Sequence, residues 1–208
     1  MPRFLKPDFY APNLEDYTPE NLAMYGIYPD TIGIDIDCTA VEHHGTELSQ
    51  HTVEWFTMWQ ENDAQMRIGS NANLPRNIQL IEMLDGIIDP SDIFASKGLT
   101  LGIKGKPHPS LVQKVIEGSR VALYIGDQLP KDVLGTNLAR IANRLEEIMD
   151  PNHDYEAPEL YSGLVAKRGN VDHPGVAIQR IAIDNPARAL YGIPLREDAV
   201  PPGVYRVR

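Results

Sequence analysis

The length, composition and charge of the chain exclude several broad classes of protein. Its 208 residues suffice for one domain with a buried core, and 42% hydrophobic with 23% charged residues is typical of a globular protein, not of a disordered or membrane-spanning one. The net charge of −10 opposes non-specific binding to nucleic acid or to an anionic bilayer, so no nucleic-acid partner is expected.

The acidic residues are distributed unevenly along the chain. Residues 1–33 carry 2 basic and 5 acidic side chains and residues 34–70 carry 1 and 7, so nine of the ten excess negative charges precede position 71. Either this region is solvated surface or its carboxylates surround a cation. Residues 161–208 carry 7 basic and 4 acidic side chains, which leaves peripheral contact with a membrane open. The single Cys38 excludes an internal disulfide and favours a cytoplasmic protein.

Hydrophobic periodicity predicts alternating helices and strands in the first half of the chain. Thr18 followed by Pro19 is typical of an N-cap and a first helical residue, and predicts a short helix over 19–25. The later elements are expected to be strands over 31–37 and 66–71 and helices over 50–61 and 75–84.

The same alternation continues in the second half, with a helix over 109–117 and a strand over 121–126. Apolar residues at steps of 4, 3, 4 and 3 predict an amphipathic helix over 133–149. We expect its apolar face to pack against the sheet of the same chain, with self-association into a homo-oligomer as the alternative. The rest is predicted to form a linker over 151–160, a strand over 164–169, a helix over 175–183 and an irregular Pro-rich tail over 193–208. Residues 1–208 thus predict one α/β domain with a largely parallel sheet.

Polar side chains follow the predicted strands, where the ligand crevice of a parallel sheet lies. They are Asp35, Asp37 and Thr39 after the first strand, Ser70 and Asn71 after the second, Asp127 and Asp132 after the third, and Lys106 before the helix at 109. Carboxylates without His or Cys at matching positions favour Mg²⁺, and a lysine with a hydroxyl can hold phosphoryl oxygens. Phosphoryl transfer needs in-line positioning and charge neutralisation, and a carboxylate can serve as its nucleophile.

These residues occur in the order of four known motifs. The segment DIDCT resembles the DxDxT motif of haloacid-dehalogenase (HAD) superfamily phosphatases, Ser70 resembles motif II, Lys106 motif III, and GDQLPKD the GDxxxxD form of motif IV. The flanking segments are similar to the YqeG type of subfamily IIIA, which includes enzymes similar to phosphatidylglycerophosphate phosphatase, over about residues 1–140 and 162–190. The resemblance implies a HAD-like Rossmannoid three-layer fold and an Mg²⁺-dependent phosphatase that forms an aspartyl phosphate.

The resemblance also implies a role for each candidate residue. Asp35 would be the nucleophile and Asp37 the general acid and base, steadied by Thr39. Ser70, Asn71 and Lys106 would bind the phosphate together with Thr39. Mg²⁺ would be held by Asp35, Asp127 and the backbone carbonyl of Asp37, with Asp132 holding metal-bound water or the lysine. The second Asp favours a phosphatase over a dehalogenase, because departure of a halide needs no proton.

Three features depart from the family pattern: Cys38 stands where Asn is usual, Ala72 interrupts a paired Asn, and 141–160 resembles an insertion. The gaps from Asp35 to Ser70 and from Ser70 to Lys106 span 35 and 36 positions, too short for a folded lid. No large cap domain is therefore expected, and the open site favours a bulky phosphorylated substrate or a lid donated by a partner subunit. The phospholipid phosphatidylglycerophosphate is the first candidate substrate, and nucleotides, sugar phosphates and phosphoproteins are the alternatives. The alternative function is a non-catalytic phosphate-binding or scaffold module.

Overall fold

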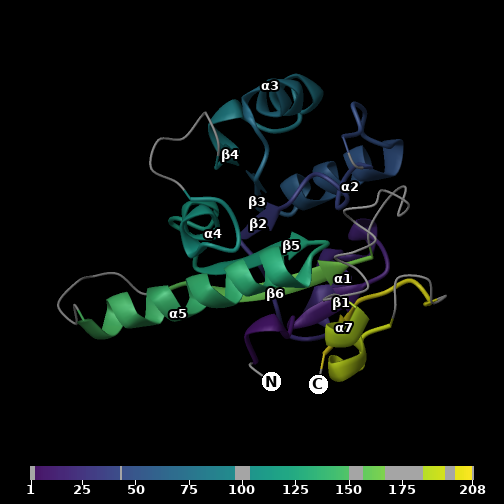
Figure 1. The fold of residues 1–208 in the computed structure, drawn as a ribbon. Helices are drawn as coiled ribbons and strands as arrows, with labels where there is room; N and C mark the ends of the chain where they lie inside the picture. The colour runs from purple at the N-terminus through teal and green to yellow at the C-terminus, as the bar shows by residue number, and fades with distance from the viewer. Residues whose placement is uncertain are drawn as a thin grey trace.

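A single seven-stranded sheet organises the chain (Figure 1). The structure, a computed structural model, describes residues 3–42, 44–96, 104–149, 157–166, 185–194 and 200–207. The strands are β1 (Phe9–Ala11), β2 (Thr31–Ile34), β3 (Gln65–Ser70), β4 (Ile93–Ala95), β5 (Val121–Gly126), β6 (Glu159–Val165) and β7 (Tyr205–Arg206). Their order across the sheet is β4-β3-β2-β5-β6-β1-β7, and every neighbouring pair is parallel except β1 with β7.

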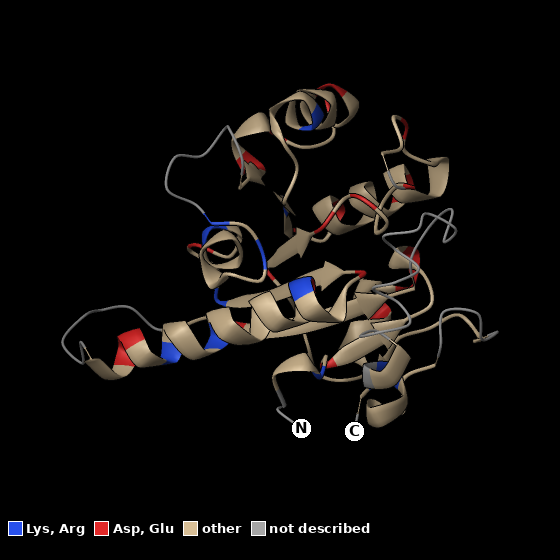
Figure 2. Ribbon diagram, in the orientation of Figure 1, with Lys and Arg blue, Asp and Glu red and all other residues tan. Residues whose placement is uncertain are grey.

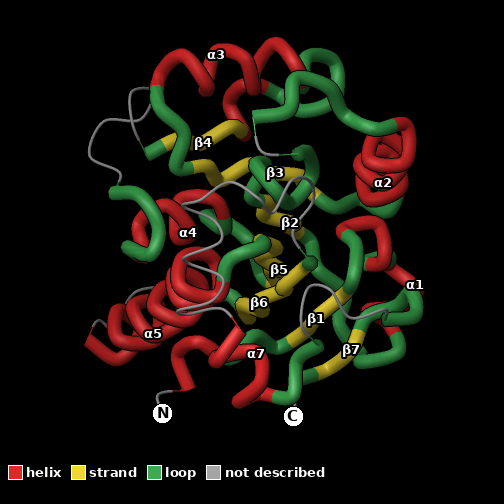
Figure 3. The backbone as a smooth tube through the Cα atoms, turned by 45° about the vertical axis from the view of Figure 1, so that its right-hand side comes forward, coloured by secondary structure: helices red, strands yellow, loops and turns green. Residues whose placement is uncertain are grey.

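Helices lie on both faces of this sheet (Figure 3). They are α1 (Pro19–Ala23), α2 (Gln50–Glu61), α3 (Leu74–Met83), α4 (Pro109–Val115), α5 (Leu134–Met149) and α7 (Asn185–Tyr191), and a short π-helical segment, Leu129–Val133, leads into α5. The first three begin at side-chain N-caps, because Thr18, Ser49 and Asn73 each accept a backbone N–H from the first turn. No helix within the described ranges is both long and apolar enough to cross a bilayer.

Alternation along the strands builds a separate core on each face of the sheet. In β2, Ile32 and Ile34 pack into the core beneath α1, α2 and α3, while Gly33 faces the opposite core. On that side a Cβ at Gly33 would lie 2.6 Å from Val115 of α4 and 2.7 Å from the ring of Tyr124 in β5. The side chain of Tyr124 therefore occupies space that only glycine leaves open. The prediction of a three-layer α/β fold with a mostly parallel sheet is confirmed.

Several short elements were not predicted from the sequence. The strands β1 and β4 have three residues each and β7 has two, too few to show a period. The strand β6 begins at Glu159, inside the predicted linker, and residues 141–149 of the expected insertion continue α5. The helix predicted over 175–183 and the end of the strand predicted over 164–169 lie outside the described residues.

The apolar face of α5 points away from the sheet, so the prediction that it packs against the chain's own sheet is wrong. Toward its C-terminal end Leu145, Ile148 and Met149 are 52%, 73% and 82% exposed. The residues that α5 buries are small or polar, among them Gly135, Thr136, Ala139 and Asn143. This face of α5 lies against α4 and the residues before it, since Pro107 and Val112 are 3.6 and 3.7 Å from where a Cβ at Gly135 would sit.

Candidate functional site

The carboxyl ends of β2, β3 and β5 meet because the strands pair in register. Ile34 of β2 lies opposite Ile68 of β3 and Ile125 of β5. The backbone N–H of Asp35 then donates to the carbonyl of Ile125 at 2.9 Å, which fixes the first residue beyond β2. As predicted from the strand ends, Asp35 and Asp127 lie in one cluster at this edge.

Three buried carboxylates form the centre of the site. One oxygen from each of Asp35, Asp127 and Asp132 lies within 4.8 Å of the other two. Asp132 reaches this position from the π-helical segment, where its Oδ2 accepts the backbone N–H of Gln128 at 3.0 Å. Its carboxylate also lies directly against Gly126, where a Cβ would be 2.2 Å from the Asp132 Cγ. Three close carboxylate oxygens are a donor set that suits a hard divalent cation.

Lys106 joins the carboxylates through two ion pairs. Its Nζ lies 2.9 Å from Oδ1 of Asp35 and 2.6 Å from Oδ1 of Asp132, and 5.4 Å from the centre of the Tyr124 ring. The side-chain amide of Asn71 holds the lysine backbone at both ends, accepting its N–H at 2.8 Å and donating to its carbonyl at 3.0 Å. Through these two contacts Asn71 positions the backbone of Lys106, while its predicted part in binding phosphate stays a prediction.

Burial and like charges control the protonation of the cluster. Burial raises the pKa of Asp35 to about 7, because the attraction of Lys106 only partly offsets desolvation and the carboxylates of Asp132 and Asp127 raise it further. Burial opposes the charge of Lys106, yet the two paired carboxylates hold its pKa well above the usual range. Three carboxylates and one ammonium carry a formal charge of −2, which one divalent cation would offset.

The remaining predicted residues surround this cluster without joining it. Ser70 is buried at the end of β3, and its hydroxyl accepts the N–H of Ala72 at 3.1 Å. Thr39 is fully buried in the turn after β2, where its N–H donates to the carbonyl of Ile36. Directly before Thr39, Cys38 adopts a φ of 68°, in the left-handed region that Asn and Gly enter more easily.

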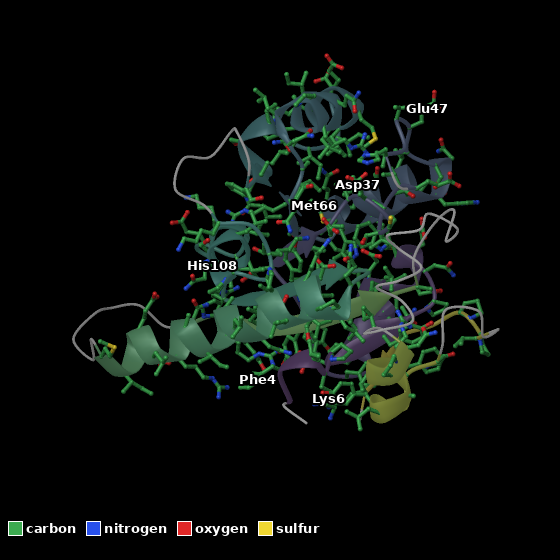
Figure 4. All side chains as sticks on the ribbon, in the orientation of Figure 1. Phe4, Lys6, Asp37, Glu47, Met66 and His108 are labelled. Atoms are coloured by element: carbon green, nitrogen blue, oxygen red, sulfur yellow. The ribbon has the colours of Figure 1, made fainter. Side chains whose placement is uncertain are left out.

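Asp37, labelled in Figure 4, is the one predicted acid outside the carboxylate cluster. Its carboxylate pairs with the guanidinium of Arg76, with Nη2 2.7 Å from Oδ1. Arg76 was not among the site residues predicted from the sequence. A signal was available, because it stands in the first turn of a predicted helix, where the helix dipole disfavours a cation unless an acid compensates.

The chain was compared with protein-family models, with curated proteins and with solved structures, and none of the three comparisons returned a match.

Proposed function

We propose that the protein is an Mg²⁺-dependent phosphomonoesterase of the HAD type that forms a phosphoryl intermediate on Asp35. The observation that carries the proposal is the buried cluster of Asp35, Asp127 and Asp132 with Lys106, at the carboxyl edge of a parallel sheet. Metal ligands, a phosphate-neutralising cation and a nucleophile are thereby combined in one place. The order of the four sequence motifs supports the same assignment.

The proposed reaction proceeds in two displacements at phosphorus. A carboxylate oxygen of Asp35 forms a bond to phosphorus while the bond to the leaving oxygen breaks, and Asp37 supplies the proton that this oxygen takes up. Asp37 then removes a proton from water as the water displaces Asp35 from phosphorus. Lys106 would neutralise charge on the phosphoryl oxygens and orient the nucleophile, and Ser70 and Thr39 would donate hydrogen bonds to phosphate. Mg²⁺ bound by the three carboxylates would supply further charge neutralisation and alignment.

The segments around the site support a bulky substrate. Between β2 and β3 the described residues form a turn and α2, and between Ser70 and Lys106 they form α3, a short 3₁₀ turn and β4. None of these described segments is a folded lid. We propose a phosphorylated substrate too large to be enclosed, with phosphatidylglycerophosphate as the first candidate, tested in detergent micelles beside nucleotide, sugar-phosphate and phosphoprotein substrates.

The wild-type protein should hydrolyse an aryl phosphate in the presence of Mg²⁺ and lose this activity when the metal is chelated. Asp35→Asn should lower turnover by about 10³-fold or more, because an amide cannot act as the nucleophile. Release of inorganic phosphate measures both effects. Asp63→Asn is the matched control, since Asp63 is exposed and has a φ of 59° that Asn tolerates. An inactive wild type that still binds Mg²⁺ and phosphate would instead identify a non-catalytic phosphate-binding module.

Mg²⁺ affinity should rise with pH up to about 7 and then level off. The pKa of Asp35 is raised to about 7, so below that pH the cation must displace a proton, whereas above it the carboxylate is already ionised. We expect about a tenfold loss of affinity per pH unit below 7. Titration calorimetry in buffers of different ionisation enthalpy would report the released proton. Asp35→Asn should abolish the dependence, and an affinity unchanged between pH 5.5 and 7 in the wild type would contradict the prediction.

A further inference from the structure

The carboxylate of Asp37 is held by two elements that flank the candidate site. Arg76, in the first turn of α3, donates from Nη2 to Oδ1 at 2.7 Å and from Nε to Oδ2 at 3.5 Å. The backbone N–H of His44 also donates to Oδ1, at 3.1 Å. Oδ1 thus accepts two short hydrogen bonds, while the contact to Oδ2 is long. The carboxylate is thus fixed mainly through Oδ1, and Oδ2 is the less engaged oxygen.

Four of the five N–H donors of the Arg76 guanidinium have acceptors within the protein. Besides Asp37, Nη2 donates to the carbonyl of Gly45 at 2.8 Å and Nη1 donates to the side chain of Gln79 at 3.4 Å. Arg76 is only 5% exposed. Because this guanidinium is buried and its two shortest hydrogen bonds go to Asp37 and Gly45, we expect its effect on the site to pass through Asp37.

Backbone contacts over residues 36–42 and at Gly45 are tight enough to transmit this restraint. The N–H of Cys38 donates to the carbonyl of Val41 at 2.8 Å, and the N–H of Val41 returns to the carbonyl of Ile36 at 3.2 Å. At Gly45 a Cβ would lie 3.2 Å from the carbonyl oxygen of Glu42, so the chain is tightly folded there. Arg76 contacts both places, at Asp37 and at Gly45.

We propose that Arg76 is a positioning residue for Asp37 that holds its carboxylate in place for proton transfer, an inference that rests on the proposed phosphatase function. Arg76 itself transfers no proton in this reaction. The proton goes from Asp37 to the leaving oxygen as the bond from phosphorus to that oxygen breaks, and Asp37 recovers a proton from the attacking water. Arg76 matters most when the leaving group needs that proton.

Two substrates that differ in the leaving group test this inference. An alkyl phosphate needs a proton on its leaving oxygen, whereas 4-nitrophenyl phosphate releases a stable anion without one. Arg76→Met should lower the single-turnover rate of alcohol release from the alkyl phosphate by about 10²-fold, within the range that general acid catalysis contributes. The single-turnover rate of nitrophenol release should fall by less than about fivefold, because this first displacement is the step whose need for a proton depends on the leaving group. Arg76→Lys should recover part of the loss, since it restores a cation at Asp37. Asp37→Asn should show the same selectivity, and adding Arg76→Met to it should cause little further loss.

Arg67→Met is the matched control, because Arg67 is also partly buried and paired with an acid, Asp92, at 3.2 Å. This variant should lower the free energy of unfolding without changing the ratio of the activities on the two substrates. Circular dichroism should first show that Arg76→Met is folded. If the wild type is active and this variant releases both leaving groups more slowly by the same factor, or releases them faster, the positioning role is overturned and the proposed function stands. If the wild type hydrolyses neither substrate, both proposals are overturned.

Discussion

Replacing Lys106 with Met should lower the free energy of unfolding of the metal-free protein by about 3–5 kcal/mol. The Lys106 ammonium is buried between Asp35 and Asp132, at 2.9 and 2.6 Å. Without it, three close carboxylates are left in a buried site with no compensating cation, and Met fills the space without supplying a charge. The same change should lower kcat of the proposed phosphatase by about 10²–10³-fold, because charge on the phosphoryl oxygens loses its partner.

Urea denaturation in the presence of a chelator measures the loss of stability. Lys104→Met is the matched control, because Lys104 is two residues away and exposed, and it should change stability by less than about 0.5 kcal/mol. Adding Asp132→Asn to Lys106→Met should recover part of the lost stability by removing one of the unpaired carboxylates. A Lys106→Met variant as stable as Lys104→Met would show that the lysine does not balance the cluster.

The strand ends made much of the site predictable from the sequence. In a parallel sheet the residues that follow neighbouring strands meet at one edge, so Asp35 and Asp127 were expected to meet once their strands were recognised. Asp132 belongs to the same cluster because a π-helical segment turns it back toward Gly126. The spacing of GDQLPKD matched a motif, but no hydrophobic pattern indicates that turn.

Features that depend on contacts between distant segments could not be predicted. The pairing of Arg76 with Asp37 joins residues 39 positions apart, and the Asn71 contacts with the Lys106 backbone join residues 35 apart. The prediction that the apolar face of α5 packs against the sheet failed for a related reason. The apolar spacing of α5 indicates an amphipathic helix but not which face is buried, and in the structure the buried face carries Gly135, Thr136 and Ala139.

The acidic first third of the chain, residues 1–70, is explained in part by the pairing of its carboxylates with distant cations. Figure 2 shows acidic positions on α2 and on the segment that leads into it. Of the seven acids between 34 and 70, Asp35 is paired with Lys106 and Asp37 with Arg76. Both cations come from later parts of the chain. A charge count by sequence segment therefore overstates the negative charge that a ligand would meet near β2.

Gly126→Ala should displace Asp132 from the carboxylate cluster without removing any charged residue. The added Cβ would lie 2.2 Å from Cγ and 2.4 Å from Cβ of Asp132, far inside normal contact. Asp132 cannot move away freely, because its two oxygens are held by Lys106 at 2.6 Å and by the N–H of Gln128 at 3.0 Å. We expect a loss of about 1–3 kcal/mol in the free energy of unfolding, as overpacking of a filled core causes.

The same displacement should weaken divalent-cation binding, since Asp132 would no longer lie within reach of both other carboxylates. Calorimetric titration with Mg²⁺ and urea denaturation test the two effects together. Gly135→Ala is the matched control: the nearest atoms to its added Cβ lie 3.6 Å away, and Ala is favoured over Gly inside a helix by about 1 kcal/mol. It should leave Mg²⁺ binding unchanged and should not destabilise the protein. Equal Mg²⁺ affinity in the Gly126→Ala and Gly135→Ala variants would show that cation binding does not depend on the position of Asp132, and would confine the metal site to Asp35 and Asp127.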